Sequence, residues 1–158
     1  MVVLNLVTTD QLRAARAVVA EGAASAGRPV PRVAVWVPAA VDEAGAAQVA
    51  RGLAVYLAQP GYGEMFAAAG FADVVAEARS GRHPRDLEPP PELVELVGAV
   101  GAPAQVRSRV LEFGEAGADV VCLAPATAAD PGAERPCTRW WARKGRAEAR
   151  VRSSVPPR

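Results

Sequence analysis

The chain has 158 residues, 51% of them hydrophobic and 22% charged, with a formal net charge of +1, which suits one globular domain that is long enough to bury a core. Its two cysteines, Cys122 in an apolar run and Cys137 in a polar segment, exclude a disulfide framework and a cysteine metal site. No run approaches the roughly 20 apolar residues of a membrane span, and no basic region precedes the first apolar stretch as in a secretory signal, so we expect a cytoplasmic protein without a membrane partner.

Three short apolar runs predict the strands of the protein. They cover residues 2–7 (VVLNLV), 32–37 (RVAVWV) and 119–124 (DVVCLA), and none of them alternates with polar residues. Continuous apolar runs of this length are typical of parallel strands covered on both faces. The pattern therefore favours an α/β fold over an antiparallel one.

The first helix is predicted directly after the first strand. Thr8 and Gln11 have the spacing of a capping box, and Gly27 followed by Pro29 ends the segment. The strand, the helix and the second strand fit within about 37 residues, which is the length of a βαβ unit. A right-handed crossover is expected for such a connection.

Three more helices and an insertion are predicted before the last strand. One helix starts after Asp42, and its apolar stripe, expected to lie in the core, includes Tyr56. Residues 60–91 are irregular and longer than a standard βα loop, which predicts an inserted subdomain. A short helix follows the three consecutive prolines, and another covers residues 103–115. The predicted order is β, α, β, α, insertion, α, α, β.

Three segments carry a resemblance to a known family. They are LNLVTT at residues 4–9, YLAQPGYGEMFAAAGF at 56–71 and GAPAQVRSRVLEFGEAGAD at 101–119. In this order they resemble the last three β/α units of luciferase-like flavin-dependent oxidoreductases, and the deazaflavin-dependent members are the closer likeness. The resemblance implies a partial TIM (β/α)8 barrel over residues 1–134, with an insertion at about 60–91 after the second strand, where the family has an extra segment.

The resemblance also implies an activity. Members of the family are monooxygenases or dehydrogenases that use FMN or a 5-deazaflavin coenzyme on a small organic substrate. The resemblance further implies that the chain lacks the first five strands of the family barrel, which hold the cofactor ring and most of its phosphate site. No glycine-rich phosphate loop replaces them, since PGYGEMF does not have the GxGxxG spacing. Cofactor binding and catalysis by this chain alone are therefore not expected.

A second interpretation is a non-catalytic remnant, or a partner subunit that completes a barrel with another chain. Three parallel strands alone do not close a barrel, and an open sheet of this kind leaves two unpaired edges. Self-association or pairing with a complementing chain is therefore expected.

Candidate site residues follow from the rule that TIM-barrel active sites lie at the C-terminal ends of the strands. Asn5 is a candidate for hydrogen bonding to cofactor or substrate, or is a polar side chain satisfied inside the barrel. Trp36 either lines the pocket or packs against a flanking helix. Tyr62, between two glycines, is a candidate for a ring over the substrate pocket. The sequence assigns no catalytic residue and no metal ligand.

The last part of the chain differs in charge from the rest. Residues 1–129 carry 10 Arg and 14 acidic residues, a net −4, whereas residues 130–158 carry 8 basic and 3 acidic residues, a net +5. Arginines interleaved with Trp140 and Trp141 are compatible with nucleic-acid binding. The segment 135–158 has no apolar period, however, and 17 Arg to 1 Lys indicates a GC-rich gene, so an out-of-frame reading explains it more simply. We expect a disordered basic tail and no nucleic-acid partner.

Overall fold

A computed structural model describes residues 1–126 of the chain, and the predicted basic tail at 135–158 lies outside the described residues. The elements in chain order are β1 (Val2–Asn5), α1 (Thr9–Ser25), β2 (Val33–Ala40), α2 (Glu43–Leu57), α3 (Tyr62–Phe66), a π-helical turn (Ala67–Phe71), α4 (Ala72–Arg79), a 3-10 turn (Pro84–Asp86), α5 (Pro91–Val97), β3 (Ala99–Val100), α6 (Pro103–Glu115) and β4 (Val120–Pro125). The predicted α/β class is confirmed.

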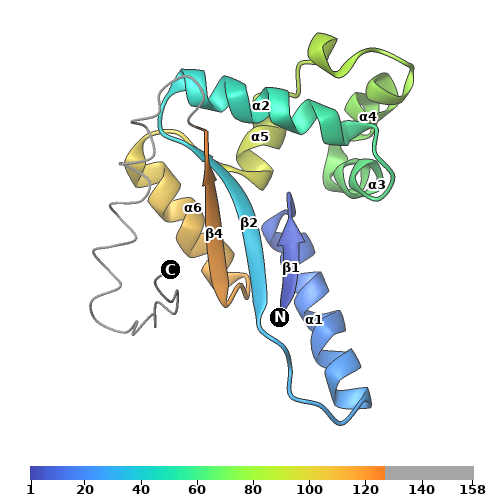
Figure 1. The fold of residues 1–158 in the computed structure, drawn as a ribbon, viewed down its shortest axis with the longest axis vertical. Coiled ribbons are helices and arrows are strands. Elements are labelled where there is room, and N and C mark those ends of the chain that lie inside the picture. The colour runs from blue at the N-terminus through green and yellow to red at the C-terminus, as the bar shows by residue number, and fades with distance from the viewer. Residues whose placement is uncertain (127–158) are drawn as a thin grey trace, which may run out of the picture.

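The strands form one parallel sheet with β2 in its centre (Figure 1). β1 lies along one edge of β2, with Asn5 opposite Trp36, and β4 lies along the other edge, with Cys122 opposite Trp36. The short strand β3 pairs with the end of β2 on the same edge as β1. Residues 1–126 thus form an open sheet rather than a closed barrel, and the outer edges of β1 and β4 have no strand partner in them.

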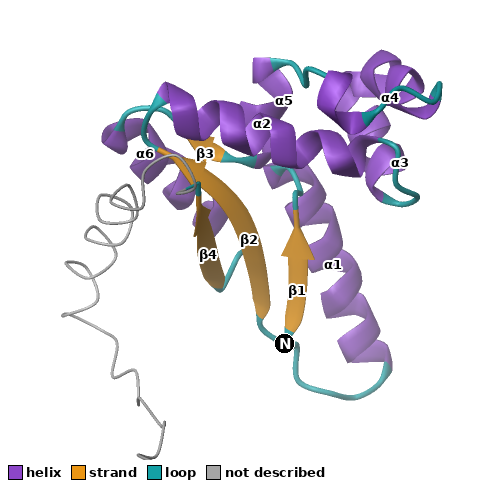
Figure 2. Cartoon of the chain, turned by 45° about the horizontal axis from the view of Figure 1, so that its top comes forward, coloured by secondary structure: helices purple, strands orange, loops and turns teal. Residues whose placement is uncertain are grey.

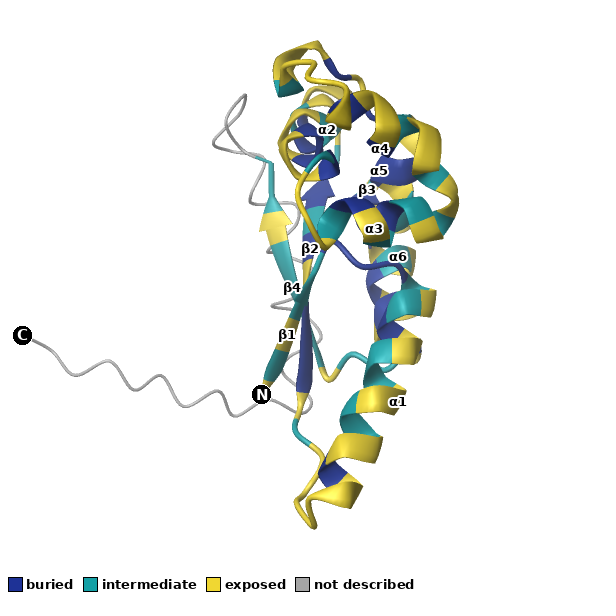
Figure 3. Ribbon diagram, turned by 90° about the vertical axis from the view of Figure 1, so that its right-hand side faces the viewer, coloured by how far each residue is buried: buried dark blue, intermediate teal, exposed yellow. Residues whose placement is uncertain are grey.

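Helices cover one face of the sheet. Figure 3 views the sheet from its edge, with α1 and α6 on one side of it. Val33, Val35 and Val37 of β2 point to this side and are fully buried. They pack with apolar residues of the two helices, namely Leu12, Val106, Phe113 and Ala116. The alternate residues of β2 therefore face the opposite side.

The opposite side, which we call the open face, has no helix layer in the described part of the chain. Its members, which alternate with the helix-facing residues in three strands, are Val3, Asn5, Ala34, Trp36, Pro38, Val120, Cys122 and Ala124, and of these only Ala34 is buried. Val3 is 52% exposed and Trp36 55% exposed. The expectation of strands covered on both faces is therefore wrong for residues 1–126, because an apolar run does not reveal which part of a protein covers it.

Two predicted helix starts are confirmed in detail. The hydroxyl of Thr8 accepts a hydrogen bond from the backbone N–H of Gln11 at 3.1 Å, and the Gln11 amide oxygen accepts one from the N–H of Thr8 at 3.0 Å. The Asp42 carboxylate accepts from the N–H of Gly45 at 2.7 Å. Each side chain satisfies a backbone donor that has no partner within its helix.

The segment at residues 60–91 is helical and lies beyond the C-terminal ends of the strands, beside α2 and α5 (Figure 2). Its Phe66 is fully buried and shares a core with Leu57 of α2 and Leu93 of α5. Gly70, with a φ of 101°, bends the chain between α3 and α4. The insertion is thus joined to the rest of the fold through a common core. Among the helices of residues 1–126, none is long and apolar enough to span a bilayer.

Candidate functional site

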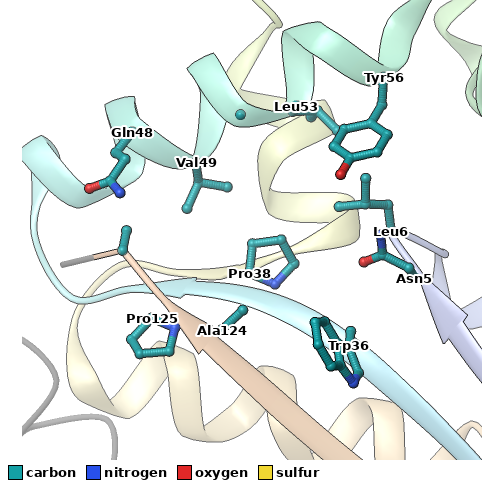
Figure 4. A pocket seen from close by; sticks show the side chains of 12 residues that line it. Asn5, Leu6, Trp36, Pro38, Gln48, Val49, Leu53, Tyr56, Ala124 and Pro125 are labelled. Atoms are coloured by element: carbon teal, nitrogen blue, oxygen red, sulfur yellow. The ribbon is translucent and has the colours of Figure 1, made fainter. Parts of the chain in front are cut away.

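A pocket of about 320 Å³ lies at the C-terminal ends of β1, β2 and β4 (Figure 4). The sheet forms its floor with Trp36, Pro38, Ala124 and Pro125, and α2 forms its roof. The remaining lining residues are Asn5, Leu6, Gln48, Val49, Gly52, Leu53, Tyr56 and Ala126. The pocket therefore occupies the strand ends where α/β proteins place their ligands.

The roof is positioned by a close approach of α2 to the sheet. A Cβ atom added to Gly45 would lie 2.9 Å from the Cβ of Ala40, so only glycine allows this approach without a shift. Further along the helix, Val49, Leu53 and Tyr56 recur at helical spacing and share one side. Val49 and Leu53 are buried, whereas Tyr56 is 36% exposed at the pocket.

One end of the pocket, which we call the end wall, is formed by Asn5 and Leu6, and the backbone of Leu6 is strained. Leu6 directly follows β1 and has a φ of 55°, in the left-handed region that a side chain other than glycine rarely adopts. In an extended strand, neighbouring side chains would point to opposite faces. The turn at Leu6 instead brings both Asn5 and Leu6 to the same pocket. Such strain, about 1–2 kcal/mol, is typical of functional sites.

Asn5 joins the pocket to the insertion. Its side-chain Nδ2 donates a hydrogen bond to the Tyr62 hydroxyl at 3.3 Å. The Tyr62 ring packs edge-on against Tyr56, with 4.8 Å between the centroids, and stacks on Phe66 at 6.3 Å. A second hydrogen bond joins α1 to the insertion, because Gln11 Nε2 donates to the backbone carbonyl of Met65 at 2.7 Å. The insertion therefore holds Asn5 and Tyr56 in place.

The structure brings together the three site residues predicted from the sequence. Asn5 and Trp36 line the pocket, whereas Tyr62, predicted to lie over it, is not among the lining residues and contacts Asn5 and Tyr56 instead. The alternative that Trp36 packs against a flanking helix is wrong, because its neighbours Val35 and Val37 take the positions that face the helices.

Sequence reasoning missed other lining residues. Tyr56 was expected in the core, yet it lies at the edge of the apolar stripe and opens into the pocket. Leu6 and Gln48 carried no signal. Only Tyr56 had a signal that could have been used, because the hydroxyl of a tyrosine on an amphipathic helix needs a polar partner or water.

Among residues 1–126, the residues that line the pocket include no Lys, Arg, His, Asp or Glu. The two carboxyls with a lowered pKa lie elsewhere and have structural roles. A hydrogen bond from the N–H of Val33 at 2.7 Å, and then one from Arg16 at 2.5 Å, lower the pKa of Asp119 where β4 begins. A hydrogen bond from Arg79 at 2.5 Å, together with one from the N–H of Gly61, lowers the pKa of Glu64. Within residues 1–126 no three His, Cys, Asp or Glu side chains gather as metal ligands would.

The residues of the pocket suit one part of a flavin or deazaflavin coenzyme and not the other. The apolar floor and roof, with the exposed indole of Trp36, offer walls for a planar ring. A phosphate needs cationic side chains or free N–H groups at a helix start. The part of the lining that belongs to the described residues has no Lys or Arg, and Asp42 and Glu43 place negative charge at the start of α2. Residues 1–126 therefore supply no phosphate site at this pocket.

Comparison with known proteins gives no match to a protein family, a curated protein or a solved structure.

Proposed function

We propose that this chain supplies three consecutive β/α units of a luciferase-like TIM barrel, and that the complete barrel is a flavin- or deazaflavin-dependent monooxygenase or dehydrogenase acting on a small organic substrate. The sheet supports this proposal, since β1, β2 and β4 lie side by side in chain order and are all parallel. Helices on one face only, with an apolar opposite face, match one wall of a barrel.

The position of the pocket is the observation that carries the proposal. It lies at the C-terminal ends of the strands and on the open face, which corresponds to the interior of a barrel. Asn5 and Tyr56 contribute polar atoms at one end, and Trp36 contributes an aromatic surface (Figure 4). A flavin or deazaflavin, when bound, supplies the hydride or oxygen chemistry. The residues of this chain orient the ring or the substrate and exclude water from one side of it.

A partner subunit that completes a barrel with another chain is the second candidate. The unpaired outer edges of β1 and β4 in residues 1–126 favour it, as does the exposed apolar surface at Val3 and Trp36. The two candidates share the same barrel and differ in whether a cofactor binds to it.

Complementation tests the proposal. The full chain is mixed with a separately produced chain that carries the first five β/α units of a luciferase-like oxidoreductase, and FMN or deazaflavin binding is followed by fluorescence. We expect the mixture to bind the coenzyme with a dissociation constant near ~1 μM, about −8 kcal/mol, and each chain alone to bind far more weakly.

The controls separate barrel closure from cofactor binding. Trp36→Lys places a charge on the open face and is expected to abolish association, whereas Val18→Lys, on an exposed position of α1, is expected to leave it unchanged. Association without coenzyme binding supports the partner subunit. A mixture that behaves as the sum of its separate chains contradicts both candidates.

A further inference from the structure

We propose that the pocket binds an uncharged, planar cyclic amide, a lactam or imide of about two fused rings. The ring lies over Trp36, the ring N–H donates to the side-chain oxygen of Asn5, and the ring carbonyl accepts from the Tyr56 hydroxyl. The inference rests on the proposed function only in naming this compound as the substrate class, because the binding itself involves residues of this chain alone.

The orientation of the Asn5 amide defines what the ligand must offer. Its Nδ2 donates one of its two hydrogens to the Tyr62 hydroxyl at 3.3 Å, and this contact fixes which way the amide carbonyl oxygen faces. Figure 4 shows this oxygen on the pocket side of the residue. A carbonyl oxygen only accepts hydrogen bonds, so the ligand has to present a donor at this point.

Tyr56 adds the complementary group. Its ring is held edge-on against Tyr62, and in Figure 4 its hydroxyl points into the pocket from the end where Asn5 lies. The Tyr56 hydroxyl and the Asn5 oxygen thus offer one donor and one acceptor at the same end of the pocket. A cyclic cis amide presents an N–H and a C=O side by side in one plane and can satisfy both at once.

The walls select for a flat and neutral molecule. Trp36 is 55% exposed, and the other floor residues are Pro38, Ala124 and Pro125. Charged ligands would lose hydration without gaining a partner from residues 1–126, whose lining side chains include no Lys, Arg, Asp or Glu. A volume of about 320 Å³ is at the small end of ligand pockets and suits a bicyclic compound.

The test uses 2-quinolone and N-methyl-2-quinolone, in which a methyl group replaces the N–H donor; Asn5→Leu, described below, separates the loss of the donor from the added bulk of the methyl group. Binding to the full chain is followed by the indole N–H signal of Trp36 in ¹H–¹⁵N NMR spectra, identified as the signal that Trp36→Phe removes. For a ligand of this size we expect a dissociation constant of ~1–5 mM. N-methylation is expected to weaken binding about fivefold, the loss of one net hydrogen bond.

Variants of Asn5 assign the preference to its oxygen. Asn5→Leu has a similar shape and no acceptor, so both probes should bind it equally. Asn5→Asp keeps an acceptor toward the ligand, while the Tyr62 hydroxyl can donate to the other carboxylate oxygen, so the preference for 2-quinolone should persist. Equal binding of the two probes to the wild-type chain, no binding of either, or a preference that survives in Asn5→Leu would overturn the proposal. A failed complementation beside a clear probe preference would reject the oxidoreductase and leave this site standing.

Discussion

Asn5 and Trp36 lie directly opposite each other in the parallel pairing of β1 with β2, and both belong to the open face. Their side chains consequently reach the same pocket, Trp36 from the floor and Asn5 from the end wall (Figure 4). This pairing places the polar anchor of the pocket next to its largest aromatic surface. The proposed binding of a ligand therefore depends on two neighbouring strands held in one register.

Filling the pocket from α2 is expected to abolish probe binding without unfolding the protein. Gly52 lines the pocket, and a Cβ atom built on it meets nothing within 4 Å. Gly52→Leu should therefore block the pocket and raise the helix propensity of α2 by about 1 kcal/mol. NMR titration with 2-quinolone measures the first effect and urea denaturation the second. Gly22→Leu, at an equally open position in α1, is the control and should keep probe binding.

The substitution Gly→Ala is expected to raise the stability of the fold at one helical position and to lower it at another. At Gly52 it should stabilise the fold by about 0.5–1 kcal/mol, because alanine favours the helix and the space is open. At Gly63 the added Cβ would lie 2.8 Å from the carbonyl oxygen of Leu57, so we expect a loss of about 1–3 kcal/mol. Thermal and urea denaturation of the two variants measure both changes in stability. Equal effects of the two substitutions would mean that α3 does not approach α2 as described.

The Asp119 carboxylate is expected to make stability fall at acid pH. Hydrogen bonds from the N–H of Val33 and from Arg16 lower its pKa in the folded state. A lowered folded pKa gives stabilisation that is present above the unfolded value of about 3.9 and is lost as pH falls through the folded pKa. Asp119→Asn should therefore be less stable than the wild type at pH 7, and the difference should shrink below pH ~4 in urea denaturation series. A difference that stays constant from pH 7 to pH 3 would assign no role to the ionised form.

The full chain is expected to self-associate through the open face and the free edges of its sheet. Trp36 and Val3 expose apolar surface there, and the outer edges of β1 and β4 are unpaired in residues 1–126. Light scattering at rising protein concentration should detect the association. Trp36→Lys should reduce it, and Val18→Lys, which removes a similarly exposed apolar side chain from α1, should not. A wild-type chain that remains a monomer would contradict this expectation.

Local signals predicted the regular parts of the fold well. The capping pattern of Thr8 and Gln11 and the cap at Asp42 both depend on neighbours within three residues, and both are present as predicted. The helix over residues 103–115 also has the predicted bounds. Strand β3 was missed, because two residues, Ala99 and Val100, are too few to show a period.

From the sequence, only those site residues could be predicted whose position is set by the strands. Asn5 could be found because it ends its strand, and Trp36 because the predicted second strand ended at Val37, although β2 continues to Ala40. The exposure of Trp36 depends on which face of the sheet the helices cover, and the hydrogen bond between Asn5 and Tyr62 joins residues 57 positions apart. Neither is encoded in a local pattern, so the alternatives for these side chains could be separated only by the tertiary arrangement.

The two ties between the insertion and the first strand also bear on the order of folding. Asn5 with Tyr62 and Gln11 with Met65 connect positions 57 and 54 residues apart, whereas the helix caps connect positions three apart. Contacts across long stretches of chain require costly loop closure and tend to form after local ones. We expect the end wall of the pocket to assemble late and to open first in native-state hydrogen exchange. The lifetime of the binding-competent pocket is then shorter than that of the sheet beneath it.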